Sequence, residues 1–425
     1  MSAPSRVRHI LAGSAGNLVE WYDWYAYSAF ALYFAPRFFP KGDTTAQLMD
    51  SAAVFAVGFL MRPIGAWLMG RYADRRGRKA GLTLSVAMMC AGSLAIALTP
   101  DVERIGLAAP VILVLARLVQ GLSLGGEYGA SATYLSEMAE PARRGFWSSF
   151  QYVTLIGGQL IALAVLLALQ SLLTPAQLES WGWRIPFLIG GALAWVVFWL
   201  RRRLVESPQF LAAREAGAPR SSAWLLFRVH PRAAFTVIGL TAGGTLAFYA
   251  YSTYMQKYLA NTAGFSRESA TAICALALLA YLLLQPVAGA LSDRVGRKPL
   301  LVGFGVLGVL FTVPIFTAIG ATRDAAVAFG LVLAALVIVT GYSSINAVVK
   351  AELFPTHVRA LGVALPYSLA NALFGGTAEY VALRFKAQGI ESGFFWYVTA
   401  MIGVSLAVYL AMPDPQRTGH LTADR

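Results

Sequence analysis

The sequence has few charged residues, and almost no cysteine or histidine, for its length. Only 13% of its 425 residues are charged, whereas soluble proteins have about 25%. Both cysteines, Cys90 and Cys274, lie in apolar segments, and the four histidines show no metal-ligand spacing. We therefore expect no disulfide framework, no bound metal and no cofactor.

Long apolar runs take the place of the missing charge. Hydrophobic residues make up 57% of the chain, and the mean hydropathy is +0.61. Runs of about 20 apolar residues satisfy their backbone groups as helices that cross a lipid bilayer. We predict an all-α integral membrane protein with twelve spans, at approximately 10–34, 51–71, 80–99, 110–136, 148–170, 185–201, 233–256, 267–291, 299–319, 325–349, 360–383 and 393–412.

A charged hairpin occurs twice, 219 residues apart. Its copies are Gly70-Arg-Tyr-Ala-Asp74-Arg75-Arg-Gly77-Arg78-Lys79 and Gly289-Ala-Leu-Ser-Asp293-Arg294-Val-Gly296-Arg297-Lys298. This repeat predicts two pseudo-symmetric six-helix bundles, residues 1–200 and 232–425, joined by a cytoplasmic linker at 201–231. We expect the hairpin charges to latch the halves together on one side and to separate when that side opens. The alternative is that the basic loops only set the topology.

The net charge of +13 is distributed unevenly along the chain. By our count, 23 of the 34 Lys and Arg residues, Lys350 among them, fall on one set of loops and tails. This bias predicts a protein of the inner (cytoplasmic) membrane with both termini in the cytoplasm, and it argues against nucleic acid as a partner. Residues 1–8 do not have the shape of a signal peptide.

Several ionisable residues lie inside the predicted spans of the first half. Each charge at the bilayer centre costs about 2.5–3.5 kcal/mol of insertion free energy, which makes such residues functional candidates. They are Glu20 and Asp23, on one face of their helix with Tyr27; Arg62, before Pro63; and a stripe of Arg117, Gln120, Glu127 and Ser131 beside Gly121, Gly125 and Gly129, which should let another helix approach closely.

The second half contributes polar aromatic and amide side chains. Tyr249 and Asn371 lie near mid-depth, so we expect them to line a cavity, and the fifth span of the first half adds the polar side chain of Gln159. Lys257, near a span end, is expected to extend to the bilayer surface. Tyr254 and Tyr258 are interpreted as anchors at the lipid–water interface.

The natural pairing of the buried charges is acid with base. We expect Asp23 or Glu20 to pair with Arg117 or Arg62 and to take up a proton when the pair opens. The alternatives are a static ion pair that only fixes helix packing, and a Glu127 that only caps a neighbouring helix.

Three motifs carry a family resemblance that covers essentially the whole chain. Gly16-Asn17-Leu-Val-Glu20-Trp21-Tyr22-Asp23, the two hairpins, and Arg117-Leu-Val-Gln120-Gly121-Leu-Ser-Leu-Gly125-Gly126-Glu127 resemble the metabolite:proton symporter branch of the major facilitator superfamily. Segments 125–134, 149–159, 253–258, 358–362 and 378–383 are similar to the members that carry α-ketoglutarate. The resemblance implies alternating access and proton-coupled import of a dicarboxylate, with Asp23 facing Arg117 as the proton-coupling pair.

On this hypothesis Arg62 and Arg117 grip carboxylates, which a guanidinium can do with two hydrogen bonds. Neutral hydrogen bonds would come from Tyr27, Gln159, Tyr249 and Asn371, and the proton carrier would be Asp23, with Glu20 or Glu127 as alternates. The protein is expected to work as a monomer. The alternatives are a symporter for citrate or a zwitterionic osmolyte, and an integral-membrane enzyme, for which the sequence shows no metal spacing or activated nucleophile.

Overall fold

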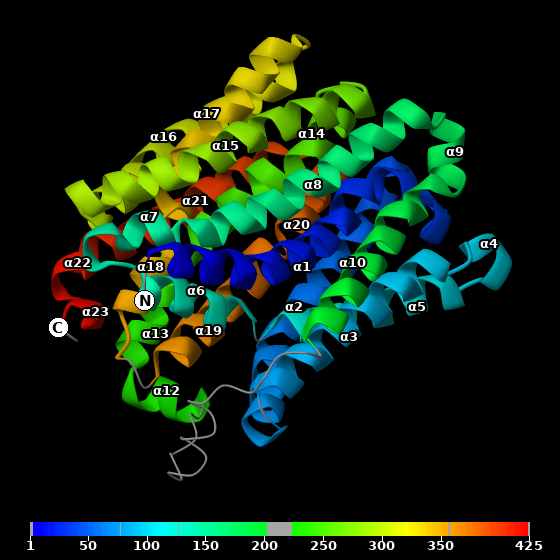
Figure 1. The fold of residues 1–425 in the computed structure, drawn as a ribbon. Coiled ribbons are helices and arrows are strands. Elements are labelled where there is room, and N and C mark those ends of the chain that lie inside the picture. The colour runs from blue at the N-terminus through cyan, green and yellow to red at the C-terminus, as the bar shows by residue number, and fades with distance from the viewer. Residues whose placement is uncertain (1–2, 77, 126, 202–222, 356–357, 424–425) are drawn as a thin grey trace.

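The structure is a computed structural model that describes residues 3–76, 78–125, 127–201, 223–355 and 358–423. Within these ranges every regular element is a helix. The long helices lie alongside one another in one bundle, and the chain begins and ends at the same end of it (Figure 1). Each of the twelve predicted spans falls on one or more of the described helices.

The first half begins with three long helices, because its apolar runs are interrupted only by short polar turns. Its elements are α1 (Ala3–Phe38), α2 (Thr44–Arg76), α3 (Arg78–Leu98), α4 (Val102–Ile105), α5 (Ala108–Leu124), α6 (Glu127–Met138), η1 (Pro141–Arg143), α7 (Arg144–Ser148), α8 (Phe150–Leu172), α9 (Pro175–Ser180), η2 (Gly182–Arg184) and α10 (Ile185–Arg201).

The second half repeats this arrangement, with two short π-helical turns inside its spans. Its elements are α12 (Ala223–Val229), α13 (Pro231–Tyr249), η3 (Ala250–Tyr254), α14 (Met255–Asn261), α15 (Arg267–Val295), α16 (Arg297–Ala321), α17 (Ala325–Ser343), α18 (Asn346–Glu352), α19 (Arg359–Ala370), η4 (Asn371–Gly375), α20 (Ala378–Ala387), α21 (Ser392–Ala411), α22 (Pro415–Thr418) and α23 (His420–Ala423).

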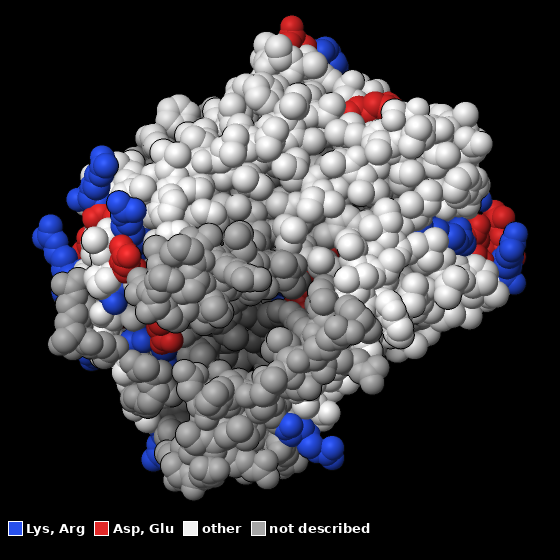
Figure 2. Space-filling view, in the orientation of Figure 1, with Lys and Arg blue, Asp and Glu red and all other residues white. Residues whose placement is uncertain are grey.

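Length and hydropathy mark the molecule as a membrane protein. Seven of the described helical segments are long and apolar enough to cross a bilayer, and three shorter apolar helices accompany them. On the face shown in Figure 2, charged side chains gather at the ends of the bundle, with a nearly uncharged band between them. Large apolar side chains such as Trp67, Leu172 and Trp396 are exposed, as expected where lipid covers the surface.

The two halves meet along helices that bring the predicted site residues together. Within the first half, α1 packs against α8 and α2 against α5; within the second, α13 packs against α19 and α21. Between the halves, α15 contacts α7 and α8, α2 contacts α20, and α6 contacts α19. α1 and α2 thus contact the second half, and α5, which carries Arg117, packs against α2.

Glycines allow α2 and α5 to touch backbone to backbone. A Cβ atom added at Gly121 would lie 2.1 Å from the carbonyl oxygen of Gly58, and one added at Gly125 would lie 2.1 Å from that of Arg62. This confirms the expected close approach for these two positions; the surroundings of Gly129 fall outside the described residues. The contact holds the Arg62 segment against the helix that carries Arg117.

Candidate functional site

Asp23 is buried in a network of polar side chains. Its Oδ1 accepts a hydrogen bond from Ser93 Oγ at 2.5 Å, and its Oδ2 accepts one from Gln120 Nε2 at 2.6 Å. Gln120 Oε1 in turn accepts from Arg117 Nη1 at 2.9 Å. Asp23 and Arg117 are thus linked through the amide of Gln120, which lies between the two charged groups. The amide still couples them, since it can donate to the acid and accept from the base at once.

The two buried arginines are held by aromatic rings. The Cζ atom of Arg117 lies 3.9 Å from the ring centre of Trp24 and 4.5 Å from that of Tyr27. The Cζ atom of Arg62 lies 3.9 Å from the ring centre of Phe59 and 4.4 Å from that of Trp24. Trp24 therefore contacts both guanidinium groups, and the attraction of a cation to a π face partly replaces the lost hydration.

Both guanidinium groups keep hydrogen-bond donors without an acceptor. The Nε and Nη2 atoms of Arg62 and of Arg117 are buried and have no hydrogen-bond partner in the part of the chain that the structure describes. Among the described residues, no carboxylate lies within 4.0 Å of either group. A buried charged donor without an acceptor is costly. The site is therefore suited to receive an anion.

A pocket between the halves opens onto one of these arginines. Its lining combines Asn17, Glu20, Trp21, Arg62, Leu124 and Tyr128 from the first half with Tyr367 and Ser368 from the second. Of the predicted residues, Arg62 and Glu20 line the pocket. Asp23 and Arg117 do not line it, although Trp24 contacts the guanidinium groups of both Arg62 and Arg117. The side chain of Glu127 falls outside the described residues.

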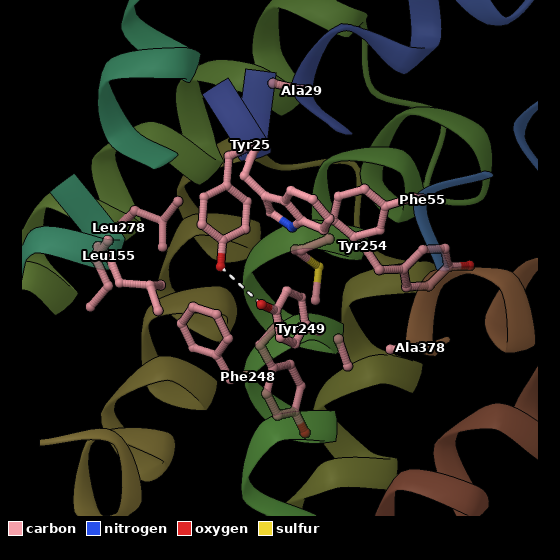
Figure 3. Close-up of a cluster of buried hydrophobic side chains, with 14 of the residues drawn as sticks. Tyr25, Ala29, Phe55, Leu155, Phe248, Tyr249, Tyr254, Leu278 and Ala378 are labelled. Carbon is pink, nitrogen blue, oxygen red and sulfur yellow. Dashed lines mark hydrogen bonds between the residues drawn. The ribbon is translucent and has the colours of Figure 1, made fainter. Parts of the chain in front are cut away.

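The second half faces this region with Tyr249 and Asn371, both buried where a helix changes to a π turn. Tyr25 OH donates to Tyr249 OH at 3.3 Å, and Figure 3 shows the two side chains pointing toward each other. Asn371 Oδ1 accepts from Thr245 Oγ1 at 2.5 Å. The ring of Tyr249 packs edge-on against Phe59, on which Arg62 stacks. π turns in long helices often occur at functional sites.

The remaining predicted neutral residues have separate positions. Tyr27 lies under the Arg117 guanidinium and donates its hydroxyl to the carbonyl oxygen of Ser51 at 3.1 Å. Gln159 is buried on α8 and, within the described part of the chain, makes no hydrogen bond to either arginine.

Lys257 forms a buried ion pair that the sequence analysis missed. Its ammonium nitrogen lies 3.1 Å from Glu379 Oε2 and also donates to Ser28 Oγ of the first half. Lys257 is 0% exposed, so the predicted extension to the bilayer surface is wrong. Tyr254 and Tyr258 are buried as well, which also corrects their interpretation as interface anchors. The pairing explains both errors, because a carboxylate inside the bundle gives the lysine a partner that lipid could not provide.

Lys350 is the second cation whose position differs from the prediction. We counted it among the loop residues, but it is 0% exposed on α18. It donates to Asn346 Oδ1 at 2.6 Å and lies 3.8 Å from the ring centre of Tyr367, which lines the central pocket. The sequence contains a sign of this buried contact. Asn346 and Lys350 are four residues apart, next to an apolar run, and residues at this spacing lie on one face of a helix.

The second charged hairpin contacts the first half. Asp293 accepts hydrogen bonds from the backbone nitrogens of Gly145 at 2.8 Å and Phe146 at 3.0 Å, and it pairs with Arg297 at 2.8 Å. Gly296, with φ +97°, ends α15 beside this contact, and Arg294 is exposed. In the first hairpin, Gly77 and the surroundings of Gly70, Asp74, Arg75 and Arg78 fall outside the described residues.

A second tie joins the halves at the same end of the bundle. Arg359 Nη1 lies 2.7 Å from Glu137 Oε1, and Arg359 also donates to the carbonyl oxygens of Ala351 and Phe354. We refer to the contacts of Asp293 and Arg359 with the first half as the latch.

This combination of fold and site defines a helical membrane transporter built from two bundles around buried charges. The sequence model of the Major Facilitator Superfamily matches residues 15–379, and the chain belongs to this family.

Curated relatives match nearly the full length of the chain. It is 55% identical to alpha-ketoglutarate permease of Escherichia coli strain K12, over 96% of this chain and 94% of the relative. It is 32% identical to a citrate-proton symporter of Klebsiella pneumoniae, over 96% and 92% of the two chains. It is 29% identical to the proline/betaine transporter of Escherichia coli strain K12, over 94% and 82%.

Solved structures agree on the fold. A crystal structure of a D-xylose-proton symporter superimposes with a TM-score of 0.77 at 20% identity, covering 97% of this chain and 99% of the other. A second structure, of the proton:xylose symporter XylE bound to 6-bromo-6-deoxy-D-glucose, gives a TM-score of 0.78 at 18% identity, covering 99% of each chain.

Proposed function

We propose that this chain is a symporter that imports α-ketoglutarate, or a closely related dicarboxylate, together with protons. The observation that carries the proposal is the pair of buried arginines, each with two guanidinium nitrogens that lack an acceptor. Buried donors of this kind, at the interface between two halves that must move, are matched by a carboxylate. The similarity to alpha-ketoglutarate permease supports the choice among organic acids.

Arg62 is proposed as the primary carboxylate ligand because it lines the pocket. Its planar guanidinium can bind a carboxylate with two parallel hydrogen bonds. Arg117 is proposed to sense the bound anion across Trp24, which contacts both groups. Tyr249, Asn371, Tyr27 and Gln159 are proposed to provide neutral hydrogen bonds once the halves rearrange.

Asp23 is proposed to carry the proton, with Glu20, which lines the pocket beside Arg62, as the alternate. The positive charge of Arg117 acts on Asp23 through Gln120. When an anion compensates that charge, the ionised form of Asp23 loses its support and the carboxyl group can bind a proton. Coupling is also expected on energetic grounds. Moving each uncompensated charge against 100 mV costs about 2.3 kcal/mol, and co-transported protons remove that cost for a dianion.

Three other functions are compared with this proposal: transport of a zwitterionic osmolyte, enzymatic activity and transport of citrate. A zwitterionic osmolyte would need free aromatic faces for its ammonium group, but the rings of Trp24 and Phe59 already hold the protein's own guanidinium groups. We infer that the chain is not an enzyme, which agrees with the permease and symporter names of its relatives. Citrate is separated from dicarboxylates by the competition experiment below.

We also propose that the hairpins at 70–79 and 289–298 form a cytoplasmic gate, with 201–231 as a cytoplasmic linker and both termini inside. The clustering of Lys and Arg on that set of loops supports this orientation. Alternating access is proposed to open the latch and the opposite end in turn, within a single monomer.

The test uses the full-length protein in liposomes under an imposed inward proton gradient. We expect accumulation of labelled α-ketoglutarate, with stronger competition by dicarboxylates than by mono- or tricarboxylates. Arg62→Ala should reduce this uptake to background. Arg323→Ala should leave it unchanged, because Arg323 is exposed and donates to the backbone carbonyl oxygens of Gly320 and Thr322.

Two results would count against the proposal. Stronger competition by citrate than by any dicarboxylate would reassign the substrate. Normal uptake kinetics in Arg62→Ala would remove Arg62 from the site.

A further inference from the structure

Lys350 is a buried cation in the second half without a counter-charge among the described residues. Its ammonium group is held by Asn346 Oδ1 at 2.6 Å, by the hydroxyl of Tyr128 at 3.4 Å, and by the face of Tyr367. Across the described ranges, no carboxylate lies within 4.0 Å of it. Lys257, which is also fully buried, has Glu379 as its partner. A lysine has three donors and a full charge, so neutral acceptors and ring faces leave it short of an anion.

Two tyrosines connect Lys350 to the central pocket. Tyr128 of α6 and Tyr367 of α19 stack with ring centres 3.8 Å apart, and both line the pocket that contains Arg62. Lys350 contacts the same two rings, with its nitrogen 3.8 Å from the centre of Tyr367 and 5.4 Å from that of Tyr128. The two rings therefore contact Lys350 of the second half and line the same pocket as Arg62 of the first.

The stack joins the two halves. Tyr128 belongs to the first half and Tyr367 to the second, so a relative motion of the bundles would separate the rings. Tyr128 also donates its hydroxyl to Asn346 Oδ1 at 2.9 Å. When the stack parts, Asn346 and Lys350 both lose a partner and face the pocket.

We propose that Lys350, positioned by Asn346, is the second carboxylate-binding site of the transporter. One carboxylate of the substrate is bound by Arg62 of the first half, and the other by Lys350 of the second half once the Tyr128–Tyr367 stack has opened. A dicarboxylate then bridges the two bundles, which a monocarboxylate cannot do. This inference rests on the proposed function and adds the residue that selects for a second acidic group.

The test compares two substrates that differ only in that second group. Uptake of labelled α-ketoglutarate in liposomes is measured for wild type and Lys350→Gln, alone and in competition with 2-oxopentanoate, the analogue that lacks the distal carboxylate. In wild type we expect α-ketoglutarate to bind far more tightly than 2-oxopentanoate. In Lys350→Gln the KM for α-ketoglutarate should rise by about 10- to 100-fold, the usual range for a charged hydrogen bond, while the inhibition constant of 2-oxopentanoate stays nearly unchanged.

Matched variants separate recognition from folding. Lys350→Arg should restore the preference for the di-acid, and Lys41→Gln, at an exposed lysine, should behave as wild type. Tyr128→Phe keeps the ring stack but removes the hydroxyl that bonds Asn346, and it should weaken the same preference more mildly. This variant decides the question if Lys350→Gln does not fold.

Equal weakening of both substrates in Lys350→Gln would overturn the proposal, because a purely structural lysine affects them alike. Recovery of normal α-ketoglutarate uptake by adding Glu127→Gln to Lys350→Gln would also overturn it, since Lys350 would then be half of an ion pair. Absence of α-ketoglutarate uptake in wild type would instead refute the proposed function itself.

Discussion

At the scale of single residues, the buried charges of the site are stabilised mostly by amides and rings. Asp23 is bonded by Ser93 and Gln120, and Arg62 is stacked on Trp24 and Phe59. A direct buried ion pair between Asp23 and Arg117 would be strong and hard to open. A bridging amide keeps the two groups coupled while leaving the arginine free to accept another anion.

This arrangement makes Asp23 the residue whose neutralisation should uncouple transport. Asp23→Asn keeps the shape, and its amide can accept from Gln120 and donate to the Ser93 hydroxyl, but it cannot gain or lose a proton. We expect exchange of labelled α-ketoglutarate across the liposome to continue, while accumulation driven by a pH gradient is lost. Asp50→Asn, at an exposed acid of the same half, serves as the control and should accumulate substrate normally. Undiminished response of Asp23→Asn to the pH gradient would assign the proton to another acid.

At the scale of elements, contact between α2 and α5 positions Arg62. The helices approach so closely that a Cβ atom at Gly125 would lie 2.1 Å from Arg62 O and 2.5 Å from Ala66 N. Because these neighbours are backbone atoms, they cannot move aside as a flexible side chain could. Small residues at such crossings are what allow helices to pack in membranes.

Gly125→Ala should therefore disturb the site through its scaffold. The added methyl group must push α5 away from α2, and overpacking of this kind costs about 1–3 kcal/mol of folding stability. We expect a lower Tm for the purified protein and reduced α-ketoglutarate uptake. Gly330→Ala is the matched control, because nothing lies within 4 Å of a Cβ atom added there. If the two variants had equal Tm values, the contact would not support the site.

At the scale of the whole molecule, both ends of the interface between the halves are tied together. At one end Asp293 and Arg359 form the latch with the first half. At the other, Lys257 joins Ser28, and Arg267 pairs with Glu179 at 2.5 Å. The described contacts correspond to a state in which the halves are held at both ends, and transport requires one set of ties to break at a time.

Weakening the latch should expose the interface at that end. The Asp293 carboxylate pairs with Arg297 and accepts hydrogen bonds from the backbone nitrogens of Gly145 and Phe146. Asp293→Asn removes its negative charge. In a protein lacking Cys90 and Cys274, a reporter Ser149→Cys, buried beside Gly289, should react with maleimide about tenfold faster or more when Asp293→Asn is present. Glu103→Gln, at an exposed acid of the short helix α4, which is distant in sequence from Asp293, should not change the rate. An unchanged rate in Asp293→Asn would mean that Asp293 does not hold the latch closed.

The sequence determined the membrane architecture because that information is local. Three features can be recognised without knowledge of tertiary contacts. They are the apolar runs long enough to cross a bilayer, the duplicated hairpin and the charges within the runs. The sequence also singled out Arg62, Arg117 and Asp23, since buried charge is rare enough in a membrane segment to stand out.

Only the tertiary structure decided which groups meet. Lys257 and Lys350 are near the ends of predicted spans, and lipid or water would draw such side chains outward. Glu379, distant in sequence, holds the first inside. The second is held by Asn346 of its own helix and by the rings of Tyr367, on the next helix, and Tyr128, in the other half. The position of the Gln120 amide between Asp23 and Arg117 also depends on packing. A helical pattern shows on which face of its helix a residue lies, but not which residue of another helix it contacts.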